Sequence, residues 1–161
     1  VAESIPWDDG TFDSVVMADV LEHCANDRDS LQEVFRILKE NGRAVITVPA
    51  YAWLWSGHDT ANHHYRRYSK QELQQKLLAS GFVIEKITYY NTFLFPFVVL
   101  TRGLKKVLRR TGSDLTMPPA IINKFLAAVF DSEKVILSRG GVFPFGVSLL
   151  CVVRRPMTNK V

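Results

Sequence analysis

The chain has 161 residues, 47% of them hydrophobic and 22% charged, which is the composition of an ordinary globular domain with its own core. Its net charge of +4 comes without a basic surface interleaved with aromatic residues, so nucleic acid is not favoured as a partner. Its two cysteines lie far apart, which excludes a disulfide framework and a paired-cysteine metal site and indicates a reducing, cytoplasmic location.

The first predicted elements form a strand–helix–strand unit. The apolar run Phe12–Ala18 is typical of a fully buried parallel strand. Asn26 or Asp27 can cap a following helix, and residues 41–42 would end it. Residues 43–49 form a second apolar strand, and a helix between two such strands predicts a right-handed βαβ unit in a parallel sheet.

The next segment, residues 50–68, has neither helical nor strand periodicity. Loops of this length in compact domains are usually functional or disordered, and the aromatic residues of this one argue against disorder. Ser69 then starts a helix, and Glu72 completes a capping box. The expected buried stripe of this helix consists of Leu73, Leu77 and Leu78.

The second half of the chain is expected to add a third strand, two helices and a last strand. Their ranges are 82–90 (strand), 93–110 (an apolar run followed by a basic helical piece), 111–119 (connector), 121–137 (helix) and 147–153 (strand). We expect the residues around 92–140 to form a helical cap over a substrate cleft. The alternative is peripheral membrane contact through residues 93–110, which are too short in apolar length to span a bilayer.

Several strings of residues occur together in a fixed order. They are Ile5-Pro6-Trp7, Gly10–Asp13 and Leu21-Glu22-His23, then residues 31–42, and then Val45–Pro49. With these strings the chain resembles the class I S-adenosylmethionine-dependent methyltransferases (type 11/12-like). The similarity continues through His58-Asp59, Arg66-Arg67-Tyr68 and residues 144–150. The resemblance implies an α/β, three-layer Rossmann-like fold whose sheet is mostly parallel with an antiparallel last strand.

The chain departs from this family in one respect. None of its nine glycines has the GxGxG spacing of the family's cofactor loop. By resemblance the chain begins just before the family's fourth strand, so we expect residues 1–161 to be a single, partial domain without the N-terminal strands. The strand Phe12–Ala18 would then lie beside an exposed sheet edge, and such edges promote self-association.

The resemblance implies S-adenosylmethionine as the cofactor of a longer parent protein. It places Ile5, Pro6 and Trp7 beside the adenine, and Ala18, Asp19, Leu21 and Glu22 along the cofactor at the strand end. The residue types alone also allow core packing for Ile5 and Trp7 and a turn at Pro6. Glu22 and His23 would face the transferred methyl group or its acceptor, although a surface ion pair or a helix cap would use the same residue types.

Methyl transfer from a sulfonium is an in-line displacement, so positioning carries most of the catalysis. A hydroxyl acceptor would need a general base, for which His23 and His58, with Asp59, are the candidates. The expected grip on a small-molecule, sugar or lipid-linked acceptor comes from His63, His64, Arg66, Arg67 and Tyr68. Histidine and aspartate suit zinc or iron, but the helical HExxH spacing is absent, so no metal ligand is assigned.

Three functions therefore remain open. The first is methyl transfer as part of a longer parent. The second is a non-catalytic, truncated domain that self-associates through its sheet edge. The third is metal-assisted hydrolysis by the loop from His58 to His64.

Overall fold

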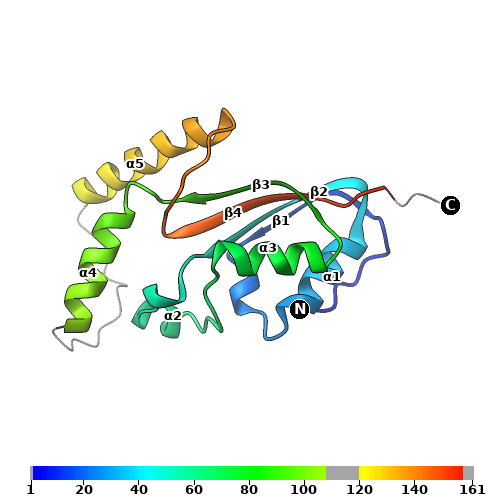
Figure 1. Cartoon of the computed structure of the whole chain (residues 1–161), viewed down its shortest axis with the longest axis horizontal. Helices are drawn as coiled ribbons and strands as arrows, with labels where there is room; N and C mark the ends of the chain where they lie inside the picture. Colours follow the sequence, from blue (N-terminus) through cyan, green and yellow to red (C-terminus); the bar gives the residue numbers. More distant parts are fainter. Residues whose placement is uncertain (1, 108–119, 158–161) are drawn as a thin grey trace.

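The computed structural model of the chain describes residues 2–107 and 120–157. Its elements in chain order are β1 Phe12–Ala18, η1 Leu21–His23, α1 Asp27–Ile37, β2 Leu38–Pro49, η2 Ala52–Leu54, α2 Gly57–Ala61, α3 Lys70–Ala79, β3 Val83–Tyr90, α4 Phe95–Val107, α5 Ala120–Ser138 and β4 Ser148–Arg154. Figure 1 shows α1 and α3 on one side of the sheet and α5 on the other, which makes three layers.

The sheet is mixed, with the strand order β1-β2-β4-β3. Strands β1 and β2 pair in parallel, whereas β4 is antiparallel to both of its neighbours. Three strands therefore run in one direction and the last strand runs against them. This topology confirms the expected α/β fold with an antiparallel last strand.

One row of residues crosses the whole sheet and forms the centre of the core. Met17 pairs with Ile46, Ile46 with Cys151, and Cys151 with Ile87. Neighbouring residues of a strand point to opposite faces, so this row lies on the face covered by α1 and α3. Leu150, the neighbour of Cys151 in β4, points to the opposite face and therefore toward α5.

Strand β1 is not fully buried, which corrects the prediction made from its apolar sequence. It lies at the edge of the described sheet, where Met17 is buried but Val16 is 70% exposed. Because the pleat points alternate side chains to opposite faces, β1 buries only the side that meets α1 and α3. Its second face carries no covering helix among the described residues.

Helix α1 begins as predicted and ends earlier than predicted. The Asn26 side chain accepts a hydrogen bond from the Asp29 backbone, but the helix ends at Ile37 rather than at residues 41–42. Leu38 is extended and pairs with Phe12 as the first residue of β2. The guanidinium of Arg155 donates to three carbonyls at this helix end, those of Phe35, Arg36 and Leu38. This distant contact satisfies acceptors that a longer helix would have used.

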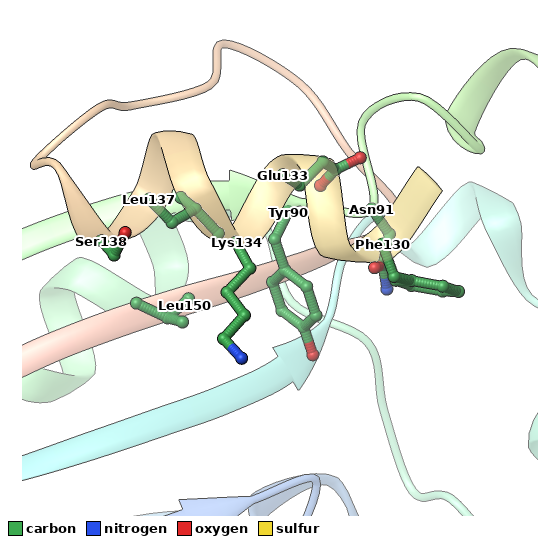
Figure 2. A pocket seen from close by; sticks show the side chains of 8 residues that line it. All are labelled: Tyr90, Asn91, Phe130, Glu133, Lys134, Leu137, Ser138 and Leu150. Atoms are coloured by element: carbon green, nitrogen blue, oxygen red, sulfur yellow. The ribbon is translucent and has the colours of Figure 1, made fainter. Parts of the chain in front are cut away.

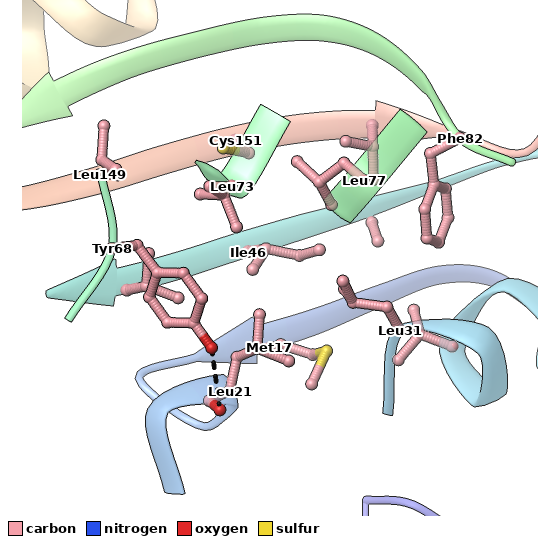
Figure 3. Packing of buried hydrophobic residues seen from close by; sticks show 14 of the residues in the cluster. Met17, Leu21, Leu31, Ile46, Tyr68, Leu73, Leu77, Phe82, Leu149 and Cys151 are labelled. Carbon is pink, nitrogen blue, oxygen red and sulfur yellow. Dashed lines mark hydrogen bonds between the residues drawn. The ribbon is translucent and has the colours of Figure 1, made fainter. Parts of the chain in front are cut away.

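Helix α3 packs against the core through two residues rather than three. Ser69 caps it as predicted, by accepting from the Glu72 backbone. Leu73 and Leu77 are fully buried, but Leu78 is exposed because one residue turns the side chain about 100° around the helix. Tyr68, just before the helix, is also fully buried, and its hydroxyl oxygen lies 3.4 Å from the Leu21 carbonyl oxygen (Figure 3).

The loop between β2 and α3 contains two short helices that periodicity did not reveal. They are η2 and α2, of three and five residues. An element of one turn is too short to leave a recurring apolar pattern.

The expected connector 111–119 and the end of the basic segment lie outside the described residues. None of the described helices combines the length and apolar character needed to cross a bilayer.

Gly146 generates a prediction about stability. A Cβ added at this position would lie 2.3 Å from the Tyr90 carbonyl oxygen, which belongs to the backbone and cannot rotate away. We expect Gly146→Ala to lower the free energy of unfolding by about 2 kcal/mol in urea denaturation. Gly103→Ala is the matched control, since nothing lies within 4 Å of that position. Equal stability of Gly146→Ala and the wild type would contradict the close approach.

Candidate functional site

The candidate site begins where β1 and β2 end at the same edge of the sheet. Asp19 follows β1 and has a left-handed backbone, with φ of 50°. Its backbone donates to the Thr47 carbonyl at 3.2 Å, and its carboxylate accepts from the Thr47 hydroxyl at 3.1 Å. These bonds fix an exposed turn in the crevice position of an open α/β sheet. Leu21, two residues later, is fully buried, so its side chain belongs to the core.

Glu22 is a buried carboxyl at this strand end. It is only 1% exposed, and within the part of the chain that is described its Oε2 atom has no hydrogen-bond partner. Burial raises the pKa of Glu22 to about 7, and the nearby negative charge of Asp19 adds to this rise. The group can therefore bind or release a proton near neutral pH.

Two histidines meet beside Glu22. The ring of His23, which is exposed, stands edge-on to the ring of His64, with 4.6 Å between their centroids. Nδ1 of His64 lies 3.0 Å from Oδ1 of Asp59. Burial lowers the pKa of His64, and Asp59 offsets only part of this effect, so the ring is neutral at pH 7. The structure thus brings together Glu22, His23 and His64, whose ligand atoms lie within 4.8 Å of one another.

Asp59 is buried inside the loop rather than open to a substrate. Its carboxylate accepts from Nε of Arg67 at 2.7 Å and from the Ser56 backbone at 2.8 Å. Burial by itself would raise the pKa of Asp59, but the Arg67 guanidinium holds it below its usual value. Arg67 also donates to the Ala50 carbonyl, which ties α2 to the end of β2. Both members of the pair therefore stabilise the loop.

A second buried carboxylate, Asp27, engages the other residues expected to bind substrate. It accepts from the Tyr68 hydroxyl at 2.9 Å and forms ion pairs with Arg66 and Lys76, both at 2.9 Å. Arg66 also donates to the Ala25 carbonyl. The guanidinium groups expected to form an anion fork are thus both engaged with carboxylates of this chain.

The two remaining histidines of the loop differ in their surroundings. Nε2 of His58, which is half-buried, lies 3.0 Å from Nδ2 of Asn62. His63 is exposed and has a left-handed backbone, with φ of 55°. Neither is part of the group formed by Glu22, His23 and His64.

The segment Ile5–Trp7 lies along α1 and is held by an arginine that sequence reasoning missed. Arg36 donates to the carbonyls of Ile5 and Trp7, and Glu33 accepts from the Ile5 backbone and from Arg36. The i, i+3 spacing of Glu33 and Arg36 was the available signal. Ile5 packs against the core, whereas Pro6 is exposed and Trp7 is 57% exposed, with its ring edge-on to Phe12.

A pocket of about 310 Å³ lies elsewhere, between α5 and the strands beneath it (Figure 2). It is lined by Tyr90, Asn91, Phe130, Glu133, Lys134, Leu137, Ser138 and Leu150. None of the predicted site residues lines it. The sequence gave no indication of this pocket, because its walls come from three separate segments of the chain, the end of β3, helix α5 and strand β4.

The network around Asp27 generates a prediction. We expect Asp27→Asn to lower the free energy of unfolding by about 2 kcal/mol at pH 7, because Lys76 and Arg66 lose their charged partner. The pKa of Asp27 lies below 3.8 in the folded chain, so its contribution is complete above about pH 4 and is lost as the pH falls through the folded value. The difference between variant and wild type should shrink over that range.

Urea titrations at several pH values would measure this difference. Asp131→Asn, at an exposed aspartate of α5, is the control and should have little effect. A pH-independent difference for Asp27→Asn would contradict the assigned role of the carboxylate.

Comparisons with known proteins find a sequence match at the start of the chain. Residues 1–46 match the family described as "Methyltransferase domain". The ubiquinone/menaquinone biosynthesis C-methyltransferase UbiE of Geotalea uraniireducens is 48% identical over 44 residues, which cover 27% of this chain and 19% of that protein. The chain therefore spans about a fifth of the length of this curated relative.

Solved structures resemble almost the whole chain. One is the complex between the Haloferax volcanii Trm112 methyltransferase activator and a putative methyltransferase, with a TM-score of 0.58, 20% identity and coverage of 99% of this chain and 60% of that one. Another is phosphoethanolamine N-methyltransferase 2 of Haemonchus contortus in complex with S-adenosyl-L-methionine, with a TM-score of 0.57, 14% identity and coverage of 98% and 36%. Residues 1–46 thus resemble a methyltransferase domain in sequence, and the described chain has the Rossmann-like fold of these methyltransferase structures.

Proposed function

We propose that this chain takes part in methyl transfer from S-adenosylmethionine and forms one wall of the cofactor site. The observation that carries the proposal is the exposed turn at Asp19, which lies at the carboxyl end of β1 and is locked to Thr47 of β2. Ligands of open α/β sheets bind at this edge. The solved relative from Haemonchus contortus, which has S-adenosyl-L-methionine bound, supports this choice of cofactor.

Trp7 is the residue best placed to contact an adenine ring. Its side chain is exposed, while its backbone is held by Arg36 and its ring by Phe12. A large aromatic face that is fixed but uncovered is suited to stacking on a planar ligand. In the proposal Asp19 and Ala18 line the same wall, and Glu22 and His23 lie toward the acceptor.

The acceptor is proposed to be a small molecule, a sugar or a lipid-linked molecule. A hydroxyl acceptor would need a group to take its proton, and His23 is the exposed histidine at the strand end. Asp59 would contribute indirectly, because it is buried and holds His64 and Arg67 in place.

Calorimetric titration with S-adenosylmethionine tests this function. We expect saturable binding by the chain, weakened about fivefold or more by Trp7→Ala because base stacking on an aromatic ring is worth about 1 kcal/mol or more. Trp53→Ala is the matched control. Trp53 has nearly the same exposed fraction as Trp7, but it belongs to η2, after strand β2. Equal weakening by both variants would contradict the role of Trp7.

A second candidate function is self-association without catalysis, and the edge position of β1 favours it. Val16 is 70% exposed, and an uncovered strand edge can pair with another chain. Absence of cofactor binding, together with dimers in sedimentation experiments, would support this candidate and contradict methyl transfer by the chain.

The exposed face of α4 supports a lipid-linked acceptor. Phe97, Leu100 and Leu104 are all more than half exposed and recur at helical spacing, and Phe93 continues the stripe just before the helix. The sequence that follows is basic, with Lys105 and Lys106 directly after Leu104. An apolar stripe next to cationic residues is typical of a helix that lies on an anionic membrane.

Sedimentation with vesicles that contain anionic lipid tests the membrane contact. We expect the wild type to sediment with them at low salt and less so as salt screens the charges, while Phe97→Glu abolishes the association. Leu78→Glu is the control, since Leu78 is also more than half exposed but lies on α3. Failure of the wild type to bind at low salt would end this proposal.

A further inference from the structure

The group formed by Glu22, His23 and His64 has the composition of a metal centre. Each residue offers one ligand atom, and the three atoms lie within 4.8 Å of one another. We propose that these three residues bind a divalent transition-metal ion at the carboxyl end of β1, with an open coordination position toward solvent. This site goes beyond the proposed methyl transfer, with which it shares Glu22 and His23.

The backbone already holds the two parts of the group together. Glu22 and His23 are neighbours in η1, and the Glu22 carbonyl accepts from the backbone of Tyr65 at 2.8 Å. This bond fixes the residue next to His64 against η1. Ligand atoms about 2.1 Å from a tetrahedral ion lie about 3.4 Å apart, so separations of up to 4.8 Å must shorten by at most about 1.4 Å. His23 is exposed, and its side chain can make this movement without disturbing the core.

His64 is oriented as a metal ligand would be. Its Nδ1 faces Oδ1 of the buried Asp59, which leaves Nε2 as the nitrogen for an ion. Asp59 is in turn fixed by Arg67 and by the Ser56 backbone. Metal-binding histidines almost always donate their second N–H to a carboxylate or carbonyl in this way, which sets the tautomer and the direction of the ring.

Glu22 supplies an independent observation. Its Oε2 atom is buried and lacks a hydrogen-bond partner among the described residues, although buried polar atoms are nearly always paired. Leaving such an atom without a partner is unfavourable, because its hydration is lost on burial and not replaced. A cation at the centre of the group would provide the missing partner.

The ligand set indicates the kind of ion. Two imidazoles and one carboxylate suit zinc, iron(II) or cobalt(II), whereas magnesium and calcium prefer sites made of oxygen atoms alone. Three protein ligands leave room for a water molecule or an oxygen atom of a ligand, as in catalytic zinc sites. With the ion bound, His23 is a ligand rather than a free base, so an acceptor hydroxyl would be activated by the ion.

Titration of the metal-free chain with cobalt(II), followed by visible absorption, tests the site. We expect one ion per chain, with the intense bands of four-coordinate cobalt, and competition by zinc(II). His23→Ala and Glu22→Gln should each weaken binding more than about tenfold. His23 is exposed, so its replacement leaves the fold intact, which circular dichroism would verify for both variants.

His63→Asn is the matched control. It removes an imidazole next to His64, and asparagine tolerates the left-handed backbone at this position. Binding that survives His63→Asn and fails in His23→Ala supports the site. Absence of stoichiometric cobalt binding, or equal loss in His63→Asn and His23→Ala, overturns it. Since the readout involves no cofactor, its outcome is distinct from that of the S-adenosylmethionine titration.

Discussion

A loop rich in charged side chains can pack against the end of a sheet only if each buried charge finds a partner. In the segment between β2 and α3, the charged side chains pair with two buried carboxylates. One is Asp59, within the segment, and the other is Asp27, the first residue of α1. Asp59 pairs with Arg67, and Asp27 pairs with Arg66 and Lys76. An unpaired charge in either place would cost several kcal/mol, so these pairs determine where the loop lies.

The geometry of the site follows from this arrangement. Because Asp59 already binds Arg67, its remaining contact orients His64 toward η1. Because Tyr65 donates to the Glu22 carbonyl, the loop closes over the strand end and buries the Glu22 side chain. This burial raises the pKa of Glu22 to about 7, with a smaller contribution from the negative charge of Asp19. Loop stability and site chemistry thus have one physical origin.

The sheet supports this loop, but helices cover its strands unequally. The antiparallel strand β4 lies between β2 and β3, where helices cover both faces. Strand β1 lies at the edge and exposes Val16 on the side away from α1 and α3. Cofactor binding and strand pairing are therefore proposed for adjacent parts of the same strand.

Local sequence patterns determined the main elements correctly, because these patterns act over a few residues. The capping residues Asn26 and Ser69 predicted the starts of α1 and α3, and the alternating or apolar runs predicted all four strands of the described sheet, although β2 begins at Leu38 rather than at residue 43. The end of α1 was wrong by several residues, since the contact that favours it comes from Arg155, far along the chain. The burial of β1 was also wrong, because composition does not reveal how many neighbours a strand has.

For the site, the sequence by itself determined the residue types and their place at a strand end. It marked the string Asp19–His23 and the histidines and arginines of the loop, and its resemblance to methyltransferases is supported by the match over residues 1–46. Only the tertiary structure decided that Arg66 and Arg67 pair internally and that Glu22, His23 and His64 meet. Spacing along a loop without periodicity carries no information about such partners, since long-range packing and the pairing of buried charges decide them.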